Sequence, residues 1–94
     1  MFGLVVRFDL RDDAAAAAFD ALVADLLPRI AAEEPGTLAY EVHTVVDAPL
    51  SRIFYERYAD RAAFAQHEAG EHTRRFLAAR EPLVARLRVE FLGS

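Results

Sequence analysis

The hydrophobic residues repeat with two different periods along the chain, and this pattern constrains the fold more than any other feature. Residues 2–10, 37–46, 52–59 and 83–92 show the two-residue alternation of a β-strand. Residues 13–34 and 61–80 carry apolar side chains three or four positions apart, which is typical of an amphipathic helix. The resulting order, β-α-β-β-α-β, predicts a ferredoxin-like α+β fold, in which both helices cover one face of a four-stranded antiparallel sheet.

Local signals predict where the two helices begin and where they are weak. Asp12 or Asp13 can cap the first helix and Asp60 the second, because a carboxylate accepts hydrogen bonds from the free amides of a first turn. Pro28 is expected to kink the first helix or to split it near residue 27. Gly70 is expected to weaken the second helix without ending it.

The strands at 37–46 and 52–59, joined by a predicted turn at 47–51, carry apolar side chains on both faces. Two helices can cover only one face of the sheet, and an apolar second face needs a partner as well. We therefore expect a homodimer in which a second copy of the sheet covers that face. The length of 94 residues fits one domain spanning 1–94, which gains stability from such association.

Composition excludes several classes of function. The net charge is −4 and no arginine cluster is interleaved with aromatic residues, so we expect no nucleic-acid partner. No apolar run approaches the length of a membrane span, and the chain opens directly into a strand pattern instead of a signal peptide. We expect a cytoplasmic protein with no membrane partner. Cysteine is absent, so thiol chemistry and cysteine-based metal sites are excluded.

Two of the three histidines lie in "HEAGEH", which at first sight resembles a zinc protease motif. That motif needs histidines at i and i+4, whereas His67 and His72 are at i and i+5, roughly 140° apart around a continuous helix. Only His43 and scattered carboxylates remain as further ligands, and a stable zinc site needs three or four that converge. We therefore predict no metal site.

Helical spacing places His72 on one face with Phe64, Glu68 and Phe76, so His72 is expected to point inward. It is then either a core histidine satisfied by a hydrogen bond or a functional base. His67 is offset from this face, which places it at the rim of a pocket or in the packing of helix on sheet. Glu68 and Glu71 are expected to be solvated, and His43 to be exposed or in a dimer interface.

Two stretches, "EPGTLAYEV" and "FYERYADRAAFAQHEAGEHTRRF", resemble the antibiotic biosynthesis monooxygenase (ABM) family of dimeric α+β barrels. Members share a Pro-Gly start to the second strand, an aromatic-Glu-x-aromatic third strand, and a helix with two spaced histidines. The residues that fit this pattern are Pro35, Gly36, Tyr40, Tyr55, Glu56, Tyr58, Ala63, Phe64, His67, His72 and Phe76.

The resemblance implies a homodimer with a pocket between sheet and helices, and oxidation of a phenol- or quinol-type aromatic substrate by O₂ without a cofactor. Such chemistry needs a base near neutrality, for which His72 is the leading candidate and His67 the second. The candidate substrate-binding residues are Tyr40, Tyr55, Tyr58, Arg52, Phe64 and Phe76.

A haem-degrading branch of the same fold is characterised by an Asn, a Trp and a haem-ligating His. This chain has neither Asn nor Trp, so we do not expect haem degradation by that route.

Other interpretations stay open. The tyrosines can equally form sheet core or dimer contacts. Arg7, Arg52 and Arg57 can form cross-strand pairs with Glu41 or Glu56. The alternative to an enzyme is a non-catalytic dimeric barrel that binds a small apolar ligand.

Overall fold

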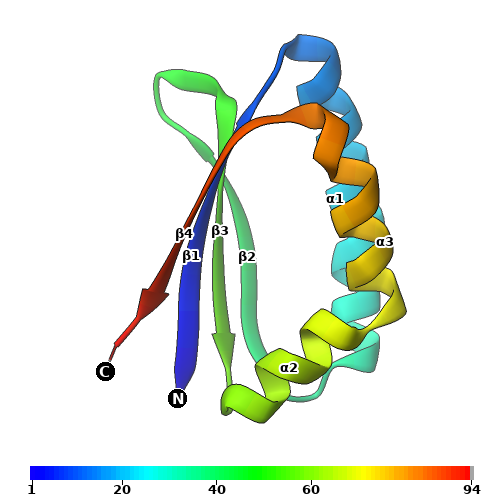
Figure 1. The fold of residues 1–94 in the computed structure, drawn as a ribbon, viewed down its shortest axis with the longest axis vertical. Helices are drawn as coiled ribbons and strands as arrows, with labels where there is room; N and C mark the ends of the chain where they lie inside the picture. Colours follow the sequence, from blue (N-terminus) through cyan, green and yellow to red (C-terminus); the bar gives the residue numbers. More distant parts are fainter. Residues whose placement is uncertain (94) are drawn as a thin grey trace.

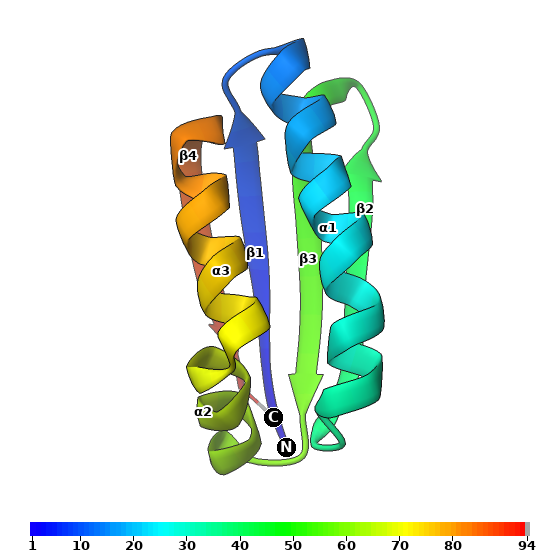
Figure 2. The same ribbon diagram turned by 90° about the vertical axis from the view of Figure 1, so that its right-hand side faces the viewer.

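Two layers, one of strands and one of helices, make up the computed structural model, which describes residues 1–93 (Figure 1). The elements in chain order are β1 (Phe2–Leu10), α1 (Asp13–Glu33), β2 (Thr37–Val45), β3 (Ala48–Tyr58), α2 (Arg61–Ala69), α3 (Glu71–Arg80), the short 3₁₀ helix η1 (Glu81–Leu83) and β4 (Val84–Leu92). All helices lie on one side of the sheet, and α1 and α3 run side by side across it (Figure 2).

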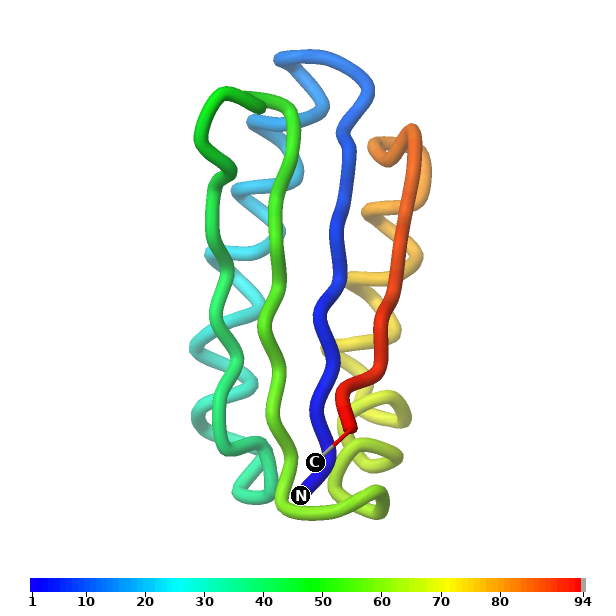
Figure 3. The backbone as a smooth tube through the Cα atoms, turned by 90° about the vertical axis from the view of Figure 1, so that its left-hand side faces the viewer, coloured from blue at the N-terminus to red at the C-terminus, as the bar shows by residue number. Residues whose placement is uncertain are grey.

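The strands form one antiparallel sheet in the order β2-β3-β1-β4. In the middle of this sheet, Val6 of β1 lies between Phe54 of β3 and Val89 of β4. This topology confirms the predicted ferredoxin-like α+β fold. Figure 3 views the sheet from its other side, where no helix covers the strands. We call the helix-covered side the inner face and the other side the outer face.

The core lies between the inner face and the helices, where strand alternation and helical period meet. Leu4, Val6, Phe8 and Leu10 are buried from β1, as their alternation predicts. Phe19 of α1 is 0% exposed and its ring contacts Phe8, Phe54 and Phe76 at centroid distances of 5.0–5.9 Å. Burial of such rings contributes most of the packing free energy of a small domain.

Helix starts follow the predicted caps, whereas the effect of Pro28 differs from expectation. The Asp12 carboxylate accepts from the Ala15 amide at 2.7 Å and Asp60 accepts from Ala63 at 2.8 Å. Pro28 lies inside α1 without splitting it. A proline removes one backbone hydrogen bond, but buried side chains on both sides of it keep this 21-residue helix packed on the sheet. Among residues 1–93, no helix is long and apolar enough to cross a membrane.

Gly70 interrupts the second helical segment instead of only weakening it. Its backbone is extended, at φ −64° and ψ 144°, so α2 ends at Ala69 and α3 begins at Glu71. The break resets the helical phase. The angle of roughly 140° expected between His67 and His72 on a continuous helix therefore does not apply.

The turn predicted at 47–51 is shorter in the structure. Val45 pairs with Ala48, so only Val46 and Asp47 form the hairpin loop and β3 already begins at Ala48. Asp47 has a φ of 63°, a left-handed conformation that aspartate adopts more readily than most residues in tight hairpin turns. The proline and polar residues that suggested a longer turn lie within the first part of the strand.

Candidate functional site

A cavity of about 250 Å³ lies between the inner face of the sheet and helices α2 and α3. Most of its walls are apolar, including Phe64 and Phe76. We call it the apolar cavity. Its polar lining residues are Tyr40, Glu56, His67, Glu68, Thr73 and Arg80. Pockets with apolar walls and a few polar groups are typical of sites for small molecules.

His67 lies on α2 and lines the apolar cavity, with only 6% of its side chain exposed. Its Nδ1 atom is 2.8 Å from Oε1 of Glu34 and 3.3 Å from Oγ1 of Thr73. Burial lowers the pKa of His67 and outweighs the attraction of Glu34. The ring is therefore neutral near pH 7, with Nδ1–H donating to the carboxylate and Nε2 carrying the lone pair.

Glu34 connects the two histidines that the sequence places five residues apart. It directly follows α1, and its carboxylate accepts from Thr37 Oγ1 at 2.7 Å, from His67, and from Nε2 of His72. Burial alone would raise the pKa of Glu34, but the hydrogen bonds from His72 and Thr37 hold it below its usual value. Glu34 is thus a buried carboxylate, 8% exposed, that stays ionised between two imidazoles.

The local backbone brings Glu34 to α2 at close range. A Cβ atom at position 36 would lie only 2.6 Å from the Cβ of Ala63, so the chain after Glu34 can approach α2 because residue 36 is glycine. The same turn accepts a hydrogen bond at the Gly36 carbonyl from the amide of Ala59, which follows β3, at 2.9 Å. The Pro-Gly pair after α1 therefore serves the site as well as ending the helix.

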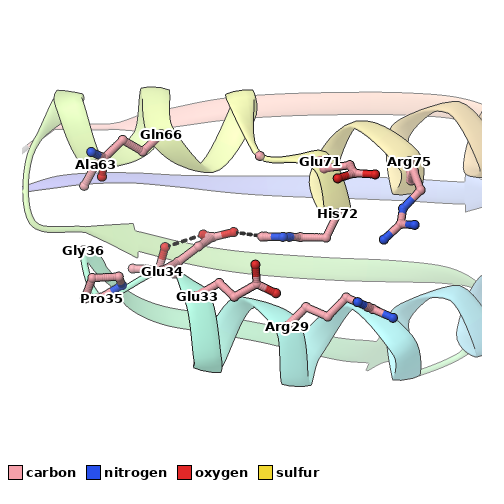
Figure 4. Close-up of a pocket in the computed structure, with 12 residues that line it drawn as sticks. Arg29, Glu33, Glu34, Pro35, Gly36, Ala63, Gln66, Glu71, His72 and Arg75 are labelled. Carbon is pink, nitrogen blue, oxygen red and sulfur yellow. Dashed lines mark hydrogen bonds and ion pairs between the residues drawn. The ribbon is translucent and has the colours of Figure 1, made fainter.

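His72 faces a second, polar hollow of about 490 Å³. Figure 4 shows this polar cleft, with the Glu34 carboxylate pointing toward His72 and with charged side chains of α1 and α3 around it. The charged lining residues are Arg29, Glu33, Glu34, Glu71 and Arg75. The chain His67–Glu34–His72 therefore runs from the apolar cavity to the polar cleft.

Glu56 of β3 is a second buried carboxylate on the apolar cavity, and its surroundings differ from those of Glu34. Its Oε1 accepts from the Tyr58 hydroxyl at 2.6 Å and lies 4.0 Å from Nε2 of His67. Burial raises the pKa of Glu56 to about 7. Burial and the charges of Glu56 and Glu34 also raise the pKa of Tyr40. Its hydroxyl therefore stays protonated and can donate a hydrogen bond to a ligand oxygen.

The predicted site residues separate into two groups in the structure. Tyr40, Phe64 and Phe76 line the apolar cavity, and Tyr58 packs against His67 with ring centroids 5.4 Å apart. Tyr55 lies on the outer face, as its alternation with Phe54 and Glu56 requires, and it accepts a hydrogen bond from Arg57. Arg52 lies outside the cavity lining, because its guanidinium donates to both oxygens of Asp20 at 2.9 and 3.0 Å.

The arginine pairs expected within the sheet are different from those observed. Arg7 pairs with Asp9 and donates to Ser51, and Arg52 pairs with α1. Glu56 accepts from tyrosine, because its inward position places it out of reach of the outer-face arginines. His43 is exposed, and its ring bonds to Glu41, two residues earlier on the same strand, at 3.1 Å.

Three residues that line or connect this site were not among the catalytic or substrate-binding residues predicted from the sequence. Glu34 resembles any residue at a helix end, and its partners are 33 and 38 positions away. Arg80 ends α3 among other arginines. Glu56 did leave a signal, because a carboxylate that alternates onto the buried face between Phe54 and Tyr58 is unusual. Among residues 1–93, no group of three or more His, Cys, Asp or Glu side chains is arranged to hold a metal ion.

The fold and its apolar cavity define a ferredoxin-like domain with a pocket between sheet and helices. Residues 1–79 match the family model described as antibiotic biosynthesis monooxygenase. The chain belongs to this family, which confirms the resemblance seen in its sequence. Membership supports a monooxygenase-type function at the level of the family. No match is found among curated proteins.

Solved structures agree with this assignment. A candidate antibiotic biosynthesis monooxygenase of Caulobacter crescentus CB15 is 26% identical, with a TM-score of 0.92 over 99% of this chain and 88% of that chain. Protein SO0527 of Shewanella oneidensis is 27% identical, with a TM-score of 0.86 over 97% and 87% of the two chains. Rv0793 of Mycobacterium tuberculosis, 24% identical with a TM-score of 0.89 over 99% and 93%, shares the fold.

Proposed function

We propose that the protein binds a phenol- or quinol-type aromatic molecule in the apolar cavity and oxidises it with O₂ and without a cofactor. In this proposal His67 is the base. The observation that carries this proposal is the orientation of His67. Its Nδ1 is fixed by the Glu34 carboxylate, so the basic Nε2 remains for the cavity side. A base held by a carboxylate and buried among apolar walls is suited to removing a proton from a hydroxyl group.

The remaining groups would stabilise what deprotonation creates. The substrate anion would accept a hydrogen bond from Tyr40, whose raised pKa keeps its proton in place. Phe64 and Phe76 would flank the ring and keep water away from the electron-rich anion. His72 would hold the Glu34 carboxylate from the polar-cleft side and so help to fix the orientation of His67, because its Nε2–H donates to the carboxylate that also accepts from His67.

The redox balance of this reaction needs no further reductant. Deprotonation makes the aromatic ring electron-rich enough to reduce O₂ directly. Oxidation of a phenol at a ring C–H group to a quinone removes four electrons, which O₂ accepts. One oxygen atom then ends in the new C=O group and the other in water, which also takes the hydroxyl hydrogen and the ring hydrogen. A hydroquinone loses two electrons and its two hydroxyl hydrogens, and O₂ then leaves as H₂O₂.

Oxygen uptake by purified, metal-stripped protein tests the proposal. We expect uptake and quinone formation with at least one member of a panel of hydroquinones and anthrones, in proportion to protein concentration. Heat-unfolded protein is the control for spontaneous autoxidation. A lack of protein-dependent uptake across the panel, together with tight binding of the same compounds, would contradict catalysis and favour the alternative of a non-catalytic binding module.

We also propose that a second copy of the chain covers the outer face. Val5, Ile53 and Tyr55 alternate onto this face and are only partly buried, and within residues 1–93 the helices all lie on the other side of the sheet (Figure 3). Sedimentation equilibrium at micromolar concentration should give twice the 10.5 kDa of one chain. Ile53→Arg should shift the mass toward the monomer, because it would bury an unpaired charge in the interface. A monomeric wild-type protein would contradict this proposal.

A further inference from the structure

Arg80 lines the apolar cavity, and one nitrogen of its guanidinium is buried there without a hydrogen-bond partner among residues 1–93. Arg80 is the last residue of α3, and its Cζ atom lies 5.5 Å from the centroid of the Phe8 ring. Its Nε atom is buried and has no hydrogen-bond partner. Within residues 1–93, it is the one buried side-chain nitrogen or oxygen atom that lacks such a partner. The charge of neighbouring Glu81 acts on the guanidinium, but burial has the larger effect on its pKa.

Arg52 is a buried arginine whose guanidinium does have hydrogen-bond partners, and it serves as a comparison. It donates to both oxygens of Asp20 and to the carbonyls of Pro49 and Ser51. Burial without such partners is costly for a charged group, and it lowers the pKa of Arg80. The helix dipole favours a positive charge near the C-terminal end of α3, but it does not replace the hydrogen bond that the buried Nε atom lacks.

Arg80 and the His67 group occupy different ends of the cavity. Phe8, beneath Arg80, pairs with Leu87 of β4. Leu4, four residues earlier on the same strand, pairs with Glu56, which lies beside His67. Four residues of a strand span about 13 Å. A ligand that contacts both ends is therefore elongated, about the length of two fused aromatic rings with their substituents.

We propose that Arg80 binds a carboxylate of the cavity's ligand, so that the ligand is an anionic aromatic acid and not a neutral arene. A planar guanidinium matches a carboxylate with two parallel hydrogen bonds, and the Phe8 ring holds its plane in position. This inference deepens the proposed function: the hydroxyl to be oxidised would lie at the far end, next to His67. The anion site itself rests only on Arg80 and the cavity.

Two acidic residues line the same cavity and bear on the choice of conditions. Glu68 is exposed at the cavity lining, and its charge acts on Glu56 and His67. Glu56 is buried, and because its pKa is about 7 it is mostly protonated at pH 6. An aromatic carboxylate is ionised at that pH, so pH 6 keeps the ligand charged while the competing carboxylate in the cavity is neutral.

Calorimetry with the full chain at pH 6 tests the proposal with two probes of matched shape, 2-naphthoate and 2-naphthamide. We expect wild-type protein to bind the naphthoate about 10–100-fold more tightly, the range that charge-assisted hydrogen bonds give. Arg80→Gln should remove this preference, and Arg80→Lys should retain part of it. Arg74→Gln, an exposed arginine of the same helix outside the cavity lining, should leave it unchanged and controls for net charge.

Equal affinity of wild-type protein for the two probes, or no binding of naphthoate, would overturn the proposal whether or not the variants fold. An unchanged preference in a folded Arg80→Gln protein would overturn it too. Neither probe carries an oxidisable hydroxyl, so the result is independent of turnover. Naphthoate binding with no oxygen uptake on any hydroxylated acid would leave the anion site in place and remove the oxygenase function.

Discussion

Replacing His67 with glutamine is expected to slow protein-dependent oxygen uptake about 10²–10⁴-fold, the usual contribution of a positioned general base. Glutamine can still donate to Glu34, so the packing around the site is retained while the titratable Nε2 is lost. Oxygen consumption at saturating substrate measures the effect. Because the base acts in the chemical step, the loss should fall on kcat more than on KM.

His43→Gln is the matched control for this prediction. His43 lies exposed on β2 and its ring bonds to Glu41 on the same strand, so its replacement should change uptake less than twofold, within the small effects of surface changes. Circular dichroism and thermal unfolding of both variants would show that the fold persists. Full activity in a folded His67→Gln protein would remove His67 from the mechanism and return His72 as the candidate base.

Replacing Glu56 with glutamine is expected to change how stability depends on pH. The pKa of Glu56 rises from 4.5 to about 7 on folding, so the native protein disfavours its ionised form. Its contribution to stability is therefore fully present below pH 4.5 and is lost as pH rises through about 7. Over this window the free-energy difference between wild type and variant should shift by about 3 kcal/mol in favour of the variant.

Urea unfolding of both proteins between pH 4.5 and 8 measures this shift. The difference between the proteins is the informative quantity, because the lowered pKa values of Glu34 and His67 act in the opposite direction in both. Their contributions are present at high pH and are lost as pH falls. Glu33→Gln, an exposed carboxylate, is the control. If the free-energy difference between the two proteins stays constant across this pH range, folding does not raise the pKa of Glu56.

Much of the fold could be predicted from local patterns. Alternation located the strands and the inward residues of β1, and Asp12 and Asp60 were expected to cap the helices that they do cap. The errors lie where tertiary contacts override local preference. Packing on both sides carries α1 through Pro28, and the interruption at Gly70 is complete where sequence propensity predicts only a weak point.

The site was less predictable, because its partners meet through the tertiary structure. Helical spacing ranked His72 above His67, but that ranking assumed a continuous helix, and the break at Gly70 turns both rings onto Glu34. Alternation already placed Tyr55 opposite to Phe54, and this was a signal against a role in the cavity. The Nε atom of Arg80 lacks a partner because no acceptor lies near it in the described part of the folded chain, and no sequence pattern predicts this.

Strand β4 forms the edge of the sheet and also one wall of the apolar cavity. Its inward side chains Leu87, Val89 and Phe91 remain 43%, 41% and 61% exposed in the chain. Such side chains rotate within nanoseconds, whereas loops and lids move far more slowly. Small molecules can therefore enter and leave past a wall of rotating side chains, without a gate. Dryness of the cavity then depends on its occupant, so a ligand that fills it excludes water and a smaller one leaves water beside the reacting atoms.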